Sequence, residues 1–257
     1  METHQFRLLN TGQHDGFSNM GLDEAILESV AKGASLPTLR FYGWAPPAVS
    51  VGYFQGLEEE VDLVSCKLHG VDVVRRITGG GAVFHHHELT YSIIMPGTHP
   101  AALPGIQDSY RILCAGIVEG FALLGVAASF VPINDIVSAD GRKLSGNAQT
   151  RRMGCVLQHG TVLLDLDAEL MFDLLKVPQE KLKGKLIQDV QAHVASLRTL
   201  GLSLSFEEAA DVFAQGFRRA LSLDFAEEAV TPTVAEAERA RVLADTKFAS
   251  REWLRKR

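Results

Sequence analysis

The segment with the clearest chemical potential covers residues 75–85 and contains three consecutive glycines, Gly79, Gly80 and Gly81. Glycine lets the backbone adopt positive φ angles and approach a ligand closely, so the N–H groups here could surround a phosphate. The spacing fits neither a Walker P-loop nor a Rossmann fingerprint, because both need a following helix. A plain glycine turn is the alternative. Arg75 and Arg76 favour a ligand site, since on a strand they point to opposite faces and at least one can reach a ligand over the turn.

A second polar segment, residues 134–149, places a lysine among small residues. Lys143 is a compact charge that can enter a pocket and neutralise negative charge developing on phosphate or carboxylate oxygens. Asp135 could hold Mg²⁺, a hard cation that takes oxygen ligands, often with bound phosphates. The alternative is a solvated Lys143 in an exposed turn that Asp135 caps. Further along, His159 begins an apolar strand and could belong to a polar rim over a pocket.

The histidines and cysteines do not favour a transition-metal centre. Alternate side chains on a strand face opposite ways, so His85, His86 and His87 cannot all bind one ion without a distorted backbone, although His85 and His87 could. No cysteine or carboxylate stands nearby at metal spacing. The cysteines are odd in number and widely spaced, which indicates neither a disulfide framework nor a zinc cluster and is typical of a reducing compartment. They are Cys66, Cys114 and Cys155.

Composition sets further limits on function. The chain has 257 residues, 46% hydrophobic and 22% charged, as expected of a packed globular protein that can bury a full core. A formal net charge of −6 argues against broad attraction to nucleic acid, which depends on basic residues neutralising phosphates. The most apolar run, residues 120–133, is too short to span a bilayer. We therefore expect a cytoplasmic protein with neither a nucleic-acid nor a membrane partner.

The arrangement of helices and strands predicts an α+β fold with a mixed sheet, because the elements alternate irregularly. Residues 71–95 look like two strands joined by a tight turn, which would bring the functional groups together. We expect a catalytic domain over residues 1–200 and, as part of the same domain, a small helical cap over residues 201–257. The predicted helices are 18–32, 57–69, 106–124, 206–222 and 234–255. The other predicted strands are 39–44, 48–54, 135–138, 142–144 and 155–166.

Together these segments resemble the biotin/lipoate A/B protein ligase family, and within it the single-domain type of the lipoate–protein ligase A branch. The matching motifs are Arg-Arg-x-Thr-Gly-Gly-Gly-Ala-Val-Phe-His, Asn-Asp-Ile, Arg-Lys-Leu-Ser-Gly-Asn-Ala-Gln and His-Gly-Thr-Val-Leu-Leu, in the family's order and approximate spacing. The resemblance covers residues 6–185 and implies a mixed β-sheet flanked by helices, with ATP and an acyl chain in one cleft. His86 departs from it, because many members carry an acidic residue there.

The resemblance also implies roles for particular residues. Lys143 would be the catalytic residue and would contact both a phosphate and the acyl carboxyl group. The other residues expected to contact ATP are Arg76, Gly81, Ala82, Val83 and Phe84. The residues expected to bind lipoate with Lys143 are Gly79, Gly80, His85 and His159. Asp135 would hold Mg²⁺, and an apolar slot for the acyl tail could come from the strands around Val51, Val73, Ile94 and Leu163.

These roles lead us to expect an ATP-dependent lipoate–protein ligase. With ATP and Mg²⁺ it would convert lipoate or octanoate to an acyl-adenylate and join the acyl group to a lysine of an acceptor lipoyl domain. An accessory ligase subunit could be needed, because the C-terminal segment is short. One alternative is an octanoyltransferase that uses a cysteine thiolate, and another is a non-catalytic acyl-binding module. The ligase is favoured because no cysteine lies at residues 130–135 or 165–191, where a transferase would need one.

Overall fold

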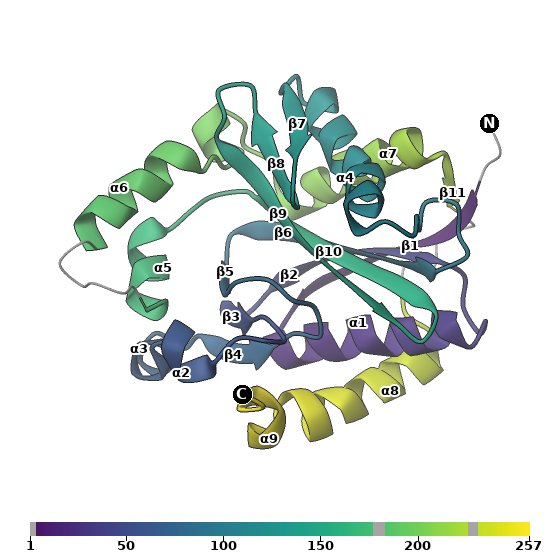
Figure 1. The fold of residues 1–257 in the computed structure, drawn as a ribbon, viewed down its shortest axis with the longest axis horizontal. Coiled ribbons are helices and arrows are strands. Elements are labelled where there is room, and N and C mark those ends of the chain that lie inside the picture. The colour runs from purple at the N-terminus through teal and green to yellow at the C-terminus, as the bar shows by residue number, and fades with distance from the viewer. Residues whose placement is uncertain (1–3, 177–182, 226–230) are drawn as a thin grey trace.

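The computed structural model describes residues 4–176, 183–225 and 231–257, whose strands form two sheets (Figure 1). The larger sheet has the order β11-β1-β2-β6-β10-β9-β8-β7 and the smaller one β4-β3-β5. The strands are β1 (His4–His14), β2 (Thr38–Trp44), β3 (Ala48–Val51), β4 (Asp72–Arg75), β5 (Val83–His85), β6 (Glu88–Pro96), β7 (Ala128–Val131), β8 (Asp135–Ser138), β9 (Lys143–Arg152), β10 (Cys155–Leu163) and β11 (Leu223–Phe225). The α-helices are α1 (Gly16–Ala31), α2 (Leu57–Glu60), α3 (Leu63–Leu68), α4 (Ile106–Leu123), α5 (Ala168–Leu174), α6 (Lys183–His193), α7 (Phe206–Leu221), α8 (Val234–Leu243) and α9 (Arg251–Leu254). A 3₁₀ turn, η2 (Arg198–Leu200), and a π-helical turn, η3 (Ala244–Phe248), complete them.

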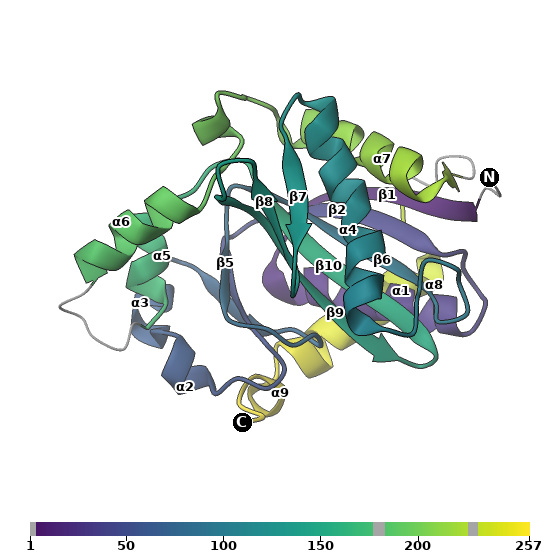
Figure 2. The ribbon, with the colours of Figure 1, turned by 45° about the horizontal axis from the view of Figure 1, so that its top comes forward.

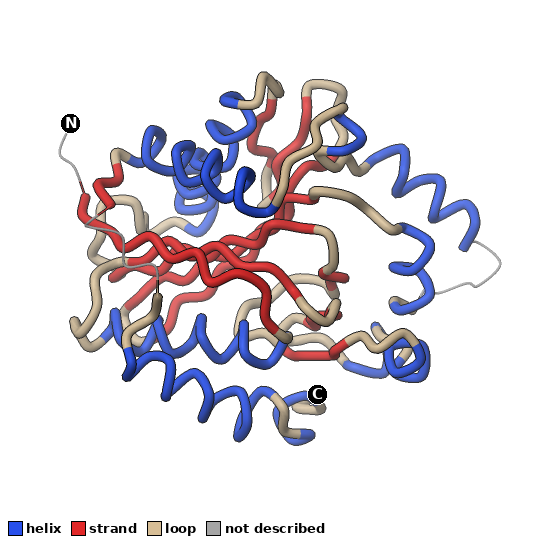
Figure 3. The backbone as a smooth tube through the Cα atoms, turned by 180° about the vertical axis from the view of Figure 1, so that it is seen from behind, coloured by secondary structure: helices blue, strands red, loops and turns tan. Residues whose placement is uncertain are grey.

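Helices cover both faces of the large sheet, with α4 and α7 on one side and α1 and α8 on the other (Figures 1 and 3). The side chains of β6 show the consequence: Tyr91 and Ile93 join the core under α4 and α7, while Ile94 joins the core over α1. Because helices cover both faces of this central strand, β6 is an almost continuous buried run. Among the described residues, none of the helices has the length and apolar content needed to cross a membrane.

The small sheet corrects one prediction. β4 and β5 are not joined as a hairpin; each pairs with β3 instead, β4 in parallel and β5 antiparallel. The glycines between them therefore form a loop, and its carbonyls are held by the side chain of Arg76. The predicted mixed sheet flanked by helices is nevertheless confirmed.

Three predicted helices also differ in detail. The first begins at Gly16, because Asp15 caps it by accepting a hydrogen bond from the Ser18 amide. The helix predicted at 57–69 is divided into α2 and α3 at Val61, which forms a bridge to Leu175. The helix predicted at 234–255 is interrupted by the π-helical turn before α9.

Ion pairs connect the C-terminal helices to the rest of the chain. The carboxylate of Glu236 on α8 accepts two hydrogen bonds from Arg7 on β1, at 3.0 and 2.8 Å. Lys247 pairs with Glu24 of α1 at 2.6 Å. These contacts place α8 and α9 beside α1 and the small sheet (Figure 1). The domain boundary near residue 200 stays a prediction.

Helices α4 and α7 lie unusually close because glycines stand where they cross. A β-carbon at Gly216 of α7 would lie 2.5 Å from the carbonyl oxygen of Gly116 and 2.5 Å from the amide nitrogen of Gly120, both in α4. The obstacles are backbone atoms, which cannot move aside as a side chain can. The separation of these two helices is therefore fixed by the absence of side chains at the crossing.

We predict that Gly216→Ala lowers the free energy of unfolding by about 1–3 kcal/mol, because the added methyl group overpacks the helix crossing. Urea denaturation monitored by circular dichroism would measure the change. Gly184→Ala on α6 is the control, because nothing lies within 4 Å of its β-carbon position. That control should be neutral or slightly stabilising. Equal stability of Gly216→Ala and the parent protein would contradict the packing argument.

Candidate active site

A cavity of about 380 Å³ opens between the small sheet, strands β9 and β10, and helices α5 and α6. Figure 2 shows α5 and α6 at the end of the molecule that also holds α2 and α3. The residues predicted for the site that line this cavity are Arg76, Gly80, Gly81, Ala82, Val83, Phe84, His85, Lys143 and His159. Gly79 and Asp135 do not line the cavity, although each is next in sequence to a residue that does, Gly80 and Asn134 respectively. The structure thus brings the predicted residues together, while their individual roles stay predictions.

Arg76 is buried in the cavity wall, and its five N–H bonds are all used within the protein. Nε donates to Thr78 Oγ1 at 3.1 Å, and Nη1 donates to the carbonyl and hydroxyl oxygens of Ser50, both at 3.0 Å. Nη2 donates to the carbonyls of Gly79 and Gly81 at 2.8 and 2.7 Å. Burial lowers the pKa of the guanidinium to about 10. Arg76 therefore fixes the shape of the glycine loop and adds positive charge to the wall.

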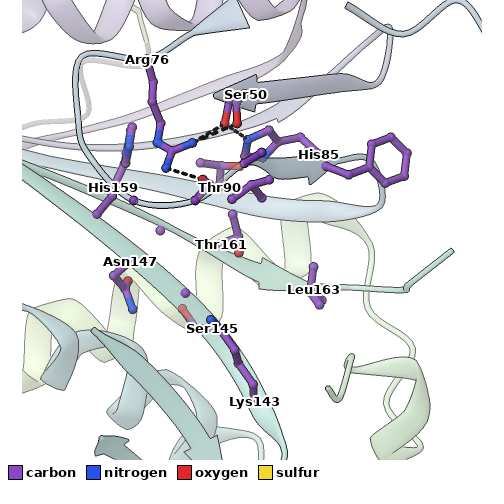
Figure 4. Close-up of a pocket in the computed structure, with 18 of the residues that line it drawn as sticks. Ser50, Arg76, His85, Thr90, Lys143, Ser145, Asn147, His159, Thr161 and Leu163 are labelled. Atoms are coloured by element: carbon purple, nitrogen blue, oxygen red, sulfur yellow. Dashed lines mark hydrogen bonds between the residues drawn. The ribbon is translucent and has the colours of Figure 1, made fainter. Parts of the chain in front are cut away.

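His85 continues this network on the side of Ser50 (Figure 4). Its Nε2 lies 2.7 Å from Ser50 Oγ, and its Nδ1 lies 2.7 Å from Glu88 Oε1. Two hydrogen bonds, one at each ring nitrogen, therefore hold the imidazole between the Ser50 hydroxyl and the Glu88 carboxyl group. The indole of Trp44 stacks on the imidazole with 4.1 Å between ring centroids. His85 is thus locked in orientation on three sides.

His159 contacts the Thr78 hydroxyl in the same way that His85 contacts the Ser50 hydroxyl. Its Nε2 lies 2.7 Å from Thr78 Oγ1, and its Nδ1 lies 3.6 Å from Asp23 Oδ2. Burial lowers the pKa of His159, although the nearby carboxylate opposes the shift. Burial alone would raise the pKa of Asp23, but Arg40 at 2.7 Å and other hydrogen bonds bring it below its ordinary value. The pair therefore combines a neutral imidazole with an ionised carboxylate.

Lys143 lies across the cavity from Arg76 and Ser50 (Figure 4). Its ammonium pairs with Asp135 Oδ1 at 2.7 Å, and its side chain is 44% exposed. It can therefore meet a ligand at the mouth with little loss of solvation. Within the described ranges, no group of three or more His, Cys, Asp or Glu side chains could hold a metal ion. Oδ1 of Asp135 is already paired with Lys143. Binding of Mg²⁺ by Asp135 therefore stays a prediction.

None of the three cysteines lines the cavity. Cys66 is on α3, Cys114 on α4 and Cys155 at the start of β10, and all are free and buried. Burial raises the pKa of the thiols to about 11 for Cys66 and about 12 for Cys114, and it also raises that of Cys155. These thiols therefore lack the exposure and the positive surroundings of a reactive thiolate.

Several residues of the site were missed by the sequence prediction. Ser50 stands in an apolar strand without any motif, so only its contacts with Arg76 and His85 reveal it. The strands expected to form the acyl slot meet the cavity through Ser50, Thr90 and Leu163, whereas Val51, Val73 and Ile94 themselves do not line it. The apolar lining includes the predicted Leu163 together with Met20, Trp44, Leu166, Met171, Leu175, Val190 and Val194.

The fold and the lined cavity match those of a known family of catalytic domains. The model for the lipoyl protein ligase A/B catalytic domain matches residues 15–218, so the chain belongs to this family. It is 34% identical to a bi-partite lipoate protein ligase from Thermoplasma acidophilum, with a TM-score of 0.85 over 98% of this chain and 96% of that one. It is 31% identical to a lipoate-protein ligase A bound with ATP, with a TM-score of 0.80 over 98% of each chain. The predicted family is therefore confirmed.

Relatives of known activity correct the predicted reaction. The chain is 40% identical to the octanoyltransferase LipM of Geobacillus kaustophilus over 100% of both chains. It is 41% identical to that of Symbiobacterium thermophilum over 98% of both. The prediction of an ATP-dependent ligase that forms lipoyl-AMP is therefore wrong. The motifs define an enzyme of the lipoate and octanoate ligase–transferase family without separating its two chemistries.

The glycine loop gives a test of the site that does not alter a cavity-lining residue. A β-carbon at Gly52, at the end of β3, would overlap the carbonyl oxygen of Gly80. We predict that Gly52→Ala displaces the loop and weakens octanoate binding at least about tenfold, or ~1.4 kcal/mol, by isothermal titration calorimetry. Gly79→Ala is the comparison, because its β-carbon would meet only Phe54 at 3.9 Å. The loop assignment fails if Gly52→Ala binds as tightly as the parent.

Proposed function

We propose that the protein transfers an octanoyl group from a carrier-bound thioester to a lysine of a lipoyl domain. The observation that carries this proposal is the full-length similarity to octanoyltransferases, 35% to 41% identical. A bi-partite neighbour from T. acidophilum is described together with its E2 lipoyl domain, which supports a lipoyl domain as the acceptor here too. The chain covers these octanoyltransferases almost from end to end, and the need for an accessory subunit stays a prediction.

The cavity suits the octanoyl chain in size and lining. Its 380 Å³ can hold eight carbons, and its apolar wall combines Trp44, Met20 and Leu163 with side chains from α5 and α6. Each buried methylene contributes about 0.8 kcal/mol to binding. The chain would lie along this wall, with its carbonyl carbon toward the polar groups.

The polar groups of the cavity would stabilise the negative charge that develops on the carbonyl oxygen during the reaction. In the proposed step the neutral lysine amine attacks the thioester carbonyl, a C–N bond forms and the C–S bond breaks. The amine proton passes to the departing thiolate, so a free thiol and an amide result. Lys143 stabilises the oxyanion of the tetrahedral intermediate, and Asp135 holds its ammonium in place.

The position of the thiols supports direct attack on the donor. No cysteine lines the cavity in the described part of the chain, so no thiol there could form a thioester with the acyl group. The donor thioester is itself an activated acyl group, so ATP and Mg²⁺ are not reactants in this scheme. Both substrates must then reach the cavity in one complex.

We predict that the purified chain octanoylates a lipoyl domain from an octanoyl carrier without ATP, and that Lys143→Ala lowers kcat on the order of a hundredfold. Intact-mass spectrometry of the lipoyl domain measures both. Arg142→Ala is the matched control, because this neighbouring cation pairs with Asp140 and does not line the cavity.

Two results would contradict the proposal. Modification that appears only with ATP and free octanoate would exclude the carrier as donor. Normal turnover by a folded Lys143→Ala variant would remove Lys143 from the mechanism, and a thermal unfolding curve shows whether the variant is folded.

A further inference from the structure

A cluster of basic and aromatic side chains borders the glycine loop on a chain whose net charge is −6. The cluster, here called the basic rim, consists of Tyr53, Phe54, Arg152, Lys256 and Arg257. Lys256 donates to the Tyr53 hydroxyl at 2.5 Å, and its ammonium lies 4.4 Å from the centre of that ring. The guanidinium of Arg152 lies 4.9 Å from the same ring, and that of Arg257 lies 5.4 Å from the ring of Phe54. Three cations thus converge on two neighbouring aromatic rings.

The rim is attached rigidly to the cavity wall by Arg75. This fully buried guanidinium donates to the carbonyls of Gly52 and Gln55, both at 2.8 Å, and to that of Leu254 at 3.0 and 2.9 Å. The indole of Trp253 returns a hydrogen bond to the Arg75 carbonyl at 2.8 Å. Arg75 is followed directly by Arg76, which holds the glycine loop. The rim and the mouth of the cavity therefore share one support.

The positive charge of the rim is left uncompensated within the described residues. Arg152, Lys256 and Arg257 take part in none of the ion pairs there, whereas the nearby Arg255 pairs with Glu58. Four of the last seven residues are basic and one, Glu252, is acidic. The hydrogen bond from Lys256 and the charges of Lys256 and Arg152 lower the pKa of the Tyr53 hydroxyl. With Phe54 63% exposed, the surface offers both charge and apolar area to a partner.

We propose that the basic rim docks the acyl donor, an acidic carrier protein that presents the octanoyl group on a phosphopantetheine arm. This inference rests on the proposed function. The carrier's acidic surface and the phosphodiester of its arm complement the three cations. The acceptor presents a lysine ammonium, which the rim repels, so the charge of the rim favours the donor.

Charge reversal tests the rim. Lys256→Glu combined with Arg257→Glu should raise the KM for the octanoyl carrier at least about tenfold and leave kcat unchanged, because exposed charges act on encounter more than on chemistry. The KM for octanoyl-pantetheine, which lacks the phosphate and the protein, should stay the same, as should that for the lipoyl domain. Arg218→Glu with Arg219→Glu is the matched control. It makes the same charge change on α7, where the two arginines contact Phe225 and Glu119.

Several outcomes would overturn the docking proposal. They are an unchanged KM for the carrier, an equal rise in the control, and a rise for the lipoyl domain instead. An equal rise for octanoyl-coenzyme A would likewise overturn it, because the rim would then bind the arm's phosphate and not a carrier protein.

Direct binding separates this proposal from the proposed reaction. Calorimetry should show the octanoyl carrier binding to the parent chain, with affinity that falls with added salt and is lost in the Lys256→Glu, Arg257→Glu variant. Binding that behaves this way in a protein unable to transfer octanoate would support the rim and contradict the reaction. Transfer by a protein whose carrier affinity is insensitive to the substitutions would support the reaction and contradict the rim.

Discussion

Burial of one arginine in the wall of the cavity is the constraint on which the site depends. A guanidinium removed from water needs an acceptor for each N–H, and Arg76 finds them in Ser50, Thr78 and the glycine loop. The two hydroxyls then need partners of their own, which His85 and His159 provide. Buried carboxylates orient both imidazoles in turn. One buried positive charge thereby fixes the shape of the loop and engages both hydroxyls that contact the imidazoles.

The fold supplies these groups from elements that are far apart in sequence. Asp23 comes from α1, Ser50 from β3, and Glu88 and His159 from β6 and β10 at the centre of the sheet. Helices on both faces bury the sheet and hold these strands in register. On the opposite wall, Lys143 keeps a half-exposed ammonium at the mouth. A rigid, charged inner wall and an accessible cation at the entrance together suit binding of an acyl group and reaction at its carbonyl.

The parts of the site that could be predicted from the sequence are those whose chemistry is local. Consecutive glycines next to arginines, and Lys143 among small residues, indicated ligand binding without knowledge of the fold. Ser50 could not be found in this way, because its role comes from Arg76, 26 positions along the chain. The hairpin predicted at 71–95 failed for a similar reason, since β3 lies between β4 and β5. The activity was mistaken because a chain with these motifs has full-length relatives named as octanoyltransferases, so the motifs do not separate ligases from transferases.

The central claim is that the acyl group passes directly from donor to lysine without residing on an enzyme thiol. Its most direct test mixes the enzyme with the octanoyl carrier in the absence of acceptor and records the enzyme's intact mass after rapid quenching. The same sample is prepared from a variant with Cys66, Cys114 and Cys155 replaced by alanine. Neither protein should carry an octanoyl adduct, and the cysteine-free variant should transfer the octanoyl group once the lipoyl domain is added. An octanoyl adduct on the parent enzyme that is absent from the cysteine-free variant, with transfer lost as well, would contradict it.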